Sequence, residues 1–109
     1  MIHKNRHLIG YISFLVMYDI NSTMIRNRLV KYLVDKGCYR IQKSIFMANL
    51  PVSQYKQITH ELLHGNYNED SMDSICILPV SMPNINDMTI IGKQINLDMI
   101  LKTTNTLFF

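Results

Sequence analysis

Residues 14–20 read FLVMYDI, and this stretch decides the fold. A continuous apolar run bounded by turn-forming residues is typical of a strand buried on both faces. The next three residues, Asn21-Ser22-Thr23, favour turns and helix caps. We therefore expect Asp19 where a central strand leaves the core, held by the sheet and open to solvent. The simpler interpretation is that Asp19 only caps or turns the chain.

The composition is typical of one globular domain. The 109 residues are 48% hydrophobic and 17% charged, and this length supports a single core. Cys38 and Cys76 are too few for a disulfide framework and lack zinc-site spacing, so we interpret both as buried or half-buried hydrophobes in a reducing compartment. The apolar run from Leu8 to Met17 lacks a cleavage site and is too short to span a membrane. A cytoplasmic protein is expected.

The net charge of +3 is unevenly distributed along the chain. Between Asn21 and His60 there is one acid, Asp35, against seven basic residues: Arg26, Arg28, Lys31, Lys36, Arg40, Lys43 and Lys56. A basic half of this kind suits a polyanionic partner, although such charges also occur on ordinary solvated faces.

The segment 23–36 is predicted to be a helix. Its apolar residues recur at the spacing of one buried stripe, with Ser22 as N-cap and Gly37 just beyond the C-terminus. Arg26 and Arg28 fall on opposite flanks of the stripe, and we expect each to lean toward the end of the first strand, 11–20.

The remaining elements complete an α+β pattern. Residues 38–50 predict two strands, or one strand bent near Lys43-Ser44. A second helix is expected from a cap at Ser53 to about His64, with Tyr55, Ile58, Leu62 and Leu63 inward and Gly65 as its end. Residues 74–80 predict a further strand, which Pro79 assigns to a sheet edge.

This order favours a ferredoxin-like βαββαβ fold, an antiparallel sheet with two helices on one face. Residues 88–92 predict an additional C-terminal strand suited to extend a partner's sheet. We expect a flexible leader at 1–10, the domain at 11–92 and a tail at 93–109.

Residues 60–64 match the zinc-hydrolase pattern H-E-x-x-H. His60 and His64 fall on the polar side of the predicted helix, which ends at once at Gly65. No third ligand stands at a family spacing. We therefore interpret the match as an ordinary solvated helix face.

Asp19 is the stronger candidate for chemistry. Magnesium takes oxygen ligands, usually one or two carboxylates together with substrate phosphates. No second acid lies nearby in the sequence, so ligand counting predicts a two-fold dimer in which both copies of Asp19 share one ion. Arg26, Arg28 and Arg40 would then bind substrate phosphates, or serve as ordinary surface arginines.

Three blocks in this order resemble a known family. They are residues 14–20, Arg26-Asn27-Arg28, and residues 39–46 with the sequence YRIQKSIF. Together they resemble the small CRISPR-associated adaptation protein, the universal partner of the CRISPR integrase and a family of CRISPR-associated endoribonucleases. Residues 90–92 fit its closing strand, and the likeness extends over about 13–93.

The resemblance implies a ferredoxin-like homodimer whose last strand pairs with the neighbouring subunit. It implies a magnesium-dependent endonuclease of RNA or DNA, with Asp19 as the metal ligand between subunits. It also implies a dimer that sits between integrase dimers and holds duplex DNA. The other positions that match the family's active site or its surroundings are Tyr18, Arg26, Arg28, Arg40, Ser44 and Phe46.

Two readings of function remain open at this stage. One is the magnesium-dependent phosphodiesterase, and the other is a non-catalytic scaffold for nucleic acid and protein. A single-strand RNA binder would need aromatic residues spaced along the sheet, and Tyr39 and Phe46 are too few. The chain also departs from the family in its longer leader and in the absence of a second acid just after Asp19.

Overall fold

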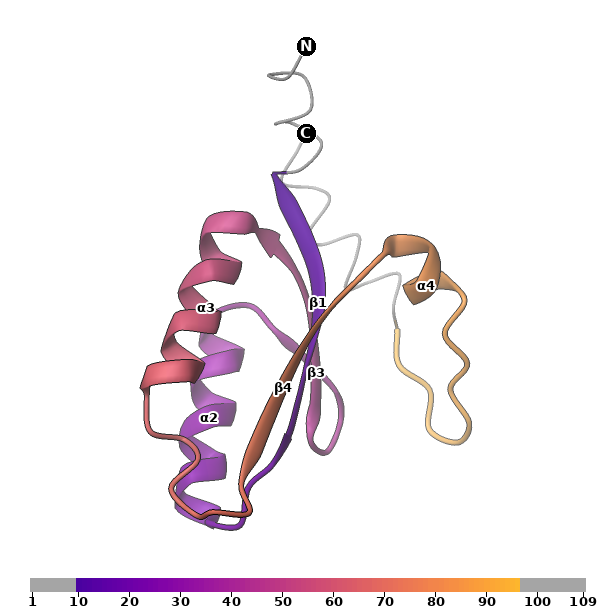
Figure 1. Ribbon diagram of the computed structural model, residues 1–109. Coiled ribbons are helices and arrows are strands. Elements are labelled where there is room, and N and C mark those ends of the chain that lie inside the picture. The colour runs from indigo at the N-terminus through magenta and orange to yellow at the C-terminus, as the bar shows by residue number, and fades with distance from the viewer. Residues whose placement is uncertain (1–9, 97–109) are drawn as a thin grey trace.

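The computed structural model describes residues 10–96, so the predicted leader and tail lie largely outside the described residues. Figure 1 shows one antiparallel sheet with two long helices on one side. The strand order is β2-β3-β1-β4, and the elements are β1 (Tyr11–Asp19), α2 (Thr23–Asp35), β2 (Tyr39–Gln42), β3 (Ile45–Pro51), α3 (Val52–His64), β4 (Ser74–Val80) and α4 (Met82–Asn86). This confirms the ferredoxin-like α+β fold.

β1 is the central strand that the apolar run predicts. It pairs with β3 on one side and β4 on the other. Because side chains alternate along a strand, Phe14, Val16 and Tyr18 face α2 and α3, where they are buried in the main core. Phe46 and Ile58 close this core from β3 and α3, and both are fully buried.

The ends of α2 form as predicted. The Ser22 side chain accepts a hydrogen bond from the Ile25 amide at 3.2 Å. Gly37 has a φ of +93°, a left-handed conformation that glycine adopts without strain. The helix ends at Asp35, with Lys36 as its C-cap, one residue earlier than predicted.

The region between the helices forms two strands joined at Lys43–Ser44, which was one of the two open alternatives. The predicted cap at Ser53 is wrong, because α3 begins at Val52 with Pro51 as N-cap and no side-chain cap. The Val52 amide instead donates to the Gly10 carbonyl at 2.8 Å. Leu63, predicted to face inward, is 75% exposed because the buried stripe of α3 is narrow.

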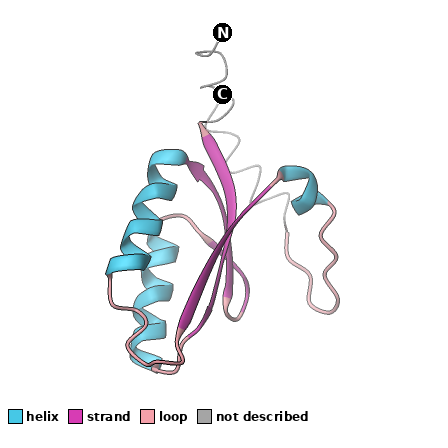
Figure 2. Ribbon diagram, in the orientation of Figure 1, coloured by secondary structure: helices cyan, strands magenta, loops and turns pink. Residues whose placement is uncertain are grey.

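The second face of the sheet is only partly covered. Figure 2 shows the short helix α4 and the loop that follows it on this side, and Ile85 of α4 packs on Met47. The sequence did not predict α4. Residues 88–92 do not form the predicted strand, since within 10–96 no strand lies beside them, and Ile91 is 94% exposed. β4 is an edge strand, as Pro79 predicts.

None of the helices in residues 10–96 has the length and apolar character needed to cross a membrane.

Candidate functional site

Asp19 is the last residue of β1 and is exposed to solvent. Its backbone is held by the sheet, where it pairs with Ser74 of β4. Among residues 10–96, no hydrogen-bond or ion-pair partner of its carboxylate is found. The expected geometry, a free carboxylate on a rigid strand end, is therefore present.

A hollow of about 500 Å³ lies around Asp19 and is lined also by Ile20, Asn21, Arg26, Asp70, Met72 and Asp73. We call it the Asp19 hollow. The Asn21 amide donates to Asp73 Oδ1 at 2.9 Å, and the Asp70 amide donates to Asp73 Oδ2 at 3.1 Å. The loop before β4 thus brings two further acids beside the end of β1. Sequence reasoning missed them because they lie about fifty positions away.

Arg26 leans toward the end of β1, as predicted. Its Nη1 donates to the carbonyls of Ile20 at 2.7 Å and Asn21 at 2.8 Å, and its Nη2 donates to the Thr23 hydroxyl at 2.8 Å. All three acceptors are neutral. The positive charge therefore stays on the wall of the Asp19 hollow.

Arg28 does not lean toward β1, and that prediction is wrong. Its Nη2 donates to the carbonyls of Gly65 at 2.9 Å and Asn66 at 3.1 Å, and its guanidinium lies 4.1 Å from the centre of the Tyr67 ring. Within the loop after α3, the Tyr67 ring packs so closely on Gly65 that a Cβ at position 65 would lie 2.5 Å from it. Arg28 therefore holds the loop that carries Asp70 and Asp73.

Tyr67 is itself fixed in this loop. It is 2% exposed, and its hydroxyl donates to Glu61 Oε2 at 2.8 Å. Burial, followed by the hydrogen bond to Glu61, raises the pKa of Tyr67 to about 12. The hydroxyl therefore remains protonated as a donor at neutral pH.

The remaining predicted residues gather at the turn between β2 and β3. Arg40 Nε and Nη2 donate to the Lys43 carbonyl at 3.1 and 2.9 Å, and the Tyr18 hydroxyl donates to the same oxygen at 3.2 Å. The Tyr18 amide donates to the Ser44 carbonyl at 3.1 Å. The Tyr18 and Phe46 rings are stacked, with centroids 6.4 Å apart. These contacts tie the turn to the strand that ends in Asp19.

The H-E-x-x-H match does not build a metal site. His60 and His64 are exposed and lie 4.5 Å apart by ring centroids, while Glu61 is engaged by Tyr67. Across residues 10–96, no group of three or more His, Cys, Asp or Glu side chains is arranged to hold a metal ion. Within these residues, the Asp19 carboxylate is therefore not part of a complete set of metal ligands.

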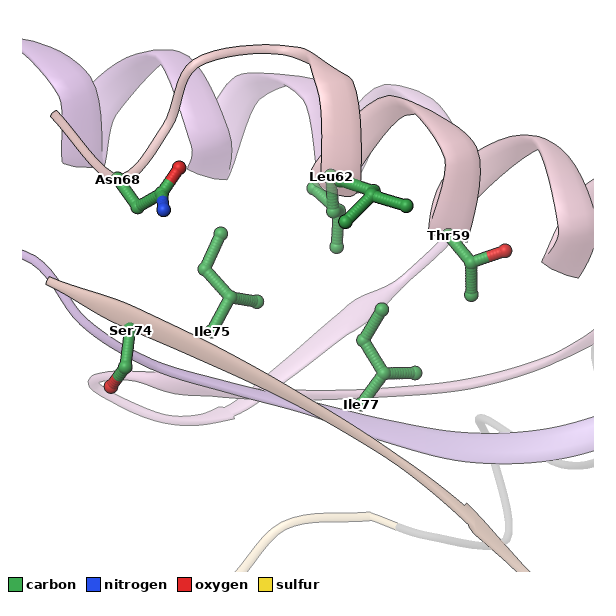
Figure 3. A pocket seen from close by; sticks show the side chains of 7 residues that line it. Thr59, Leu62, Asn68, Ser74, Ile75 and Ile77 are labelled. Atoms are coloured by element: carbon green, nitrogen blue, oxygen red, sulfur yellow. The ribbon is translucent and has the colours of Figure 1, made fainter.

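A second pocket, of about 470 Å³, lies between α3 and β4. Figure 3 shows Leu62 from the helix facing Ile75 and Ile77 from the strand. Its other lining residues, Thr59, Leu63, Asn68 and Ser74, include no acid or base. This apolar pocket lacks the groups for phosphodiester chemistry.

The fold and site define a small ferredoxin-like protein with an exposed carboxylate at the end of its central strand and Arg26 beside it. The sequence model of the family described as CRISPR associated protein Cas2 matches residues 12–88. The chain is 31% identical over 84 residues to the CRISPR-associated endoribonuclease Cas2 of Korarchaeum cryptofilum (strain OPF8). That match covers 77% of this chain and 88% of the relative. The chain belongs to the Cas2 family.

Proposed function

We propose that this chain acts in CRISPR adaptation as a homodimeric, magnesium-dependent endonuclease of RNA or DNA. The observation that carries the proposal is the exposed Asp19 carboxylate, free of partners among residues 10–96 and fixed at the end of the central strand. The relative from Korarchaeum cryptofilum is named an endoribonuclease, which supports a nuclease.

An apolar patch beside Asp19 supports the homodimer. Met17 pairs with Ile45 on one side and Cys76 on the other, and Leu78 lies one pair further along β4. We call these four residues the open patch; they lie on the sheet face opposite α2 and α3, and Leu78 is 48% exposed. Covering the open patch with a second copy would bring the two Asp19 residues toward one axis.

The charges of Asp19 and Arg26 suggest how each would act in phosphodiester cleavage. Asp19 of each copy would hold the magnesium ion, which when bound neutralises a phosphodiester and orients water for attack. The guanidinium of Arg26, whose acceptors are all neutral, would stabilise negative charge at the scissile phosphate. Arg40 and Tyr18 hold the neighbouring turn in place against the strand that carries Asp19.

The substitution Asp19→Asn tests the nuclease. It keeps the size of the side chain and removes its charge, so metal-dependent cleavage is expected to fall by on the order of 100-fold or more. Asp35→Asn is the matched control, since Asp35 is an exposed aspartate at the other end of α2. Equal cleavage by the wild type and Asp19→Asn would contradict the assignment.

A second function is a scaffold that bridges integrase dimers and holds duplex DNA. The basic residues without ion-pair partners favour the part of this proposal that concerns duplex DNA. Within residues 10–96, the sole side-chain ion pair is Lys31–Asp35, at 3.2 Å. The remaining arginines and lysines of this part keep their charge for a polyanion. Duplex affinity should therefore fall steeply with salt and survive Asp19→Asn, whereas a flat salt response would contradict a backbone-binding surface.

A further inference from the structure

A basic pocket of about 390 Å³ lies between the β2–β3 hairpin and the segment that follows α4. Its lining is Arg40, Ile41, Gln42, Lys43, Lys93 and Ile95. Three of these six side chains are cationic and none is acidic. Its two sides come from parts of the chain about fifty positions apart, so the sequence does not show that Lys93 lies beside Arg40 and Lys43. We call it the hairpin pocket.

The hairpin side is held rigidly. The Lys43 carbonyl accepts hydrogen bonds from both Arg40 and Tyr18, which fixes the turn while the Lys43 side chain stays exposed. Arg40 Nη1 has no acceptor among residues 10–96, so part of the guanidinium remains available. Both oxygen atoms that accept from Arg40, the Lys43 carbonyl and the Tyr18 hydroxyl, are uncharged, so its positive charge is not neutralised.

The opposite side is shaped by a local turn. Gly92 has a φ of +101°, and the Gln94 side-chain amide donates to the carbonyls of Ile90 at 2.7 Å and Gly92 at 3.1 Å. These contacts close the chain around Lys93 and set it at the hairpin pocket. No ion pair engages Lys43 or Lys93 in the part of the chain that the structure describes.

We infer that the hairpin pocket is a phosphate subsite for nucleic acid, in which Lys43 and Lys93 contact one phosphate group from opposite sides. The inference rests on the proposed function and adds to it a substrate contact next to the strand that carries Asp19. Three cations without an acid create a local positive potential that a phosphate neutralises. Arg40 contributes charge and holds the turn that presents Lys43.

The test is binding of a labelled duplex across a salt series, with EDTA present so that no cleavage occurs. Lys43→Gln and Lys93→Gln are each expected to raise Kd about tenfold at low salt and to lower the salt slope by about 0.9. Lys56→Gln is the matched control, an exposed lysine of α3 outside the pocket. Thermal unfolding of each variant confirms that the fold is intact.

The outcomes separate the inference from the function on which it rests. If wild type binds and either Lys43→Gln or Lys93→Gln keeps the salt slope of Lys56→Gln, the two-sided subsite is overturned and the function stands. If wild type binds no nucleic acid, both are overturned. Duplexes with and without a 5′-phosphate show which phosphate binds in the hairpin pocket. If the lysine variants lose the same affinity for both duplexes, the group is a backbone phosphate. If they lose affinity only for the phosphorylated duplex, the group is the terminal phosphate.

Discussion

The two faces of the sheet differ in how completely they are covered. On the helix face, Phe14 and Phe46 are fully buried beneath two helices of 13 residues. On the other face, the five-residue α4 covers only part of the sheet, and Leu78 remains 48% exposed. The same strand, β1, serves both faces. The contrast indicates that one face stabilises the monomer while the other, with Asp19 at its border, remains partly uncovered. We assign the proposed dimer contact to this second face.

The largest loss of stability is expected from a substitution on the helix face. Phe14→Ala should lower the free energy of unfolding by about 3–5 kcal/mol, because it opens a cavity in a fully packed core. Leu78→Ala should cost less than about 1 kcal/mol in dilute protein, since this side chain is half exposed. Urea denaturation measures both. Similar losses for the two variants would contradict the contrast between the faces.

The next effect concerns the open patch. Leu78→Asp places a charge in the proposed interface and should raise the dimer dissociation constant roughly 10- to 100-fold. Val34→Asp is the control, because Val34 is 54% exposed on α2, away from that face. Sedimentation equilibrium provides the measurement. Unchanged dimerisation in Leu78→Asp would remove the open patch from the interface.

Much of the fold followed from local patterns in the sequence. The apolar run of β1 and the cap and terminal glycine of α2 act within a few residues, and the structure confirms them. The short helix α4 was missed because five residues carry too little periodicity to detect. The predicted strand at 88–92 needs a neighbouring strand, which the described part of a single chain does not supply.

The sequence predicted only those parts of the site whose residues lie close together in the chain. The apolar run predicted the position of Asp19 at the end of β1. The position of Arg26 on the flank of the buried stripe of α2 predicted its contact with the end of that strand. Arg28 binds a loop 37 positions away, and Asn21 binds Asp73 across 52 positions. Such pairings depend on how the helices and the loop pack, which periodicity does not encode.

A smaller effect is expected at the loop beside the site. Arg28→Ala removes two hydrogen bonds to loop carbonyls and the contact with Tyr67, and should cost about 1–2 kcal/mol. Arg28→Lys should recover part of this loss. Hydrogen exchange is expected to speed up in residues 65–73 while β1 stays protected. Wild-type exchange in Arg28→Ala would show that the loop does not depend on this side chain.

The smallest expected effect is a change of stability with pH that depends on Cys38 and is absent at neutral pH. Burial raises the pKa of the Cys38 thiol from 9.0 to about 12, whereas Cys76 is exposed in the open patch. Between these pH values the unfolded chain loses the Cys38 proton and the folded chain keeps it, so stability should fall as pH rises from about 9 to 12. Urea titrations should show a shallower fall in Cys38→Ala. An identical fall in this variant would exclude Cys38 as a contributor.

The most direct test of the shared-ion site is the stoichiometry of Mn²⁺ bound in place of Mg²⁺, followed by electron paramagnetic resonance. Two Asp19 carboxylates sharing one ion predict half an ion per chain in the dimer, and loss of this binding in Asp19→Asn. One ion per chain, or binding that is unchanged in Asp19→Asn, would contradict the account.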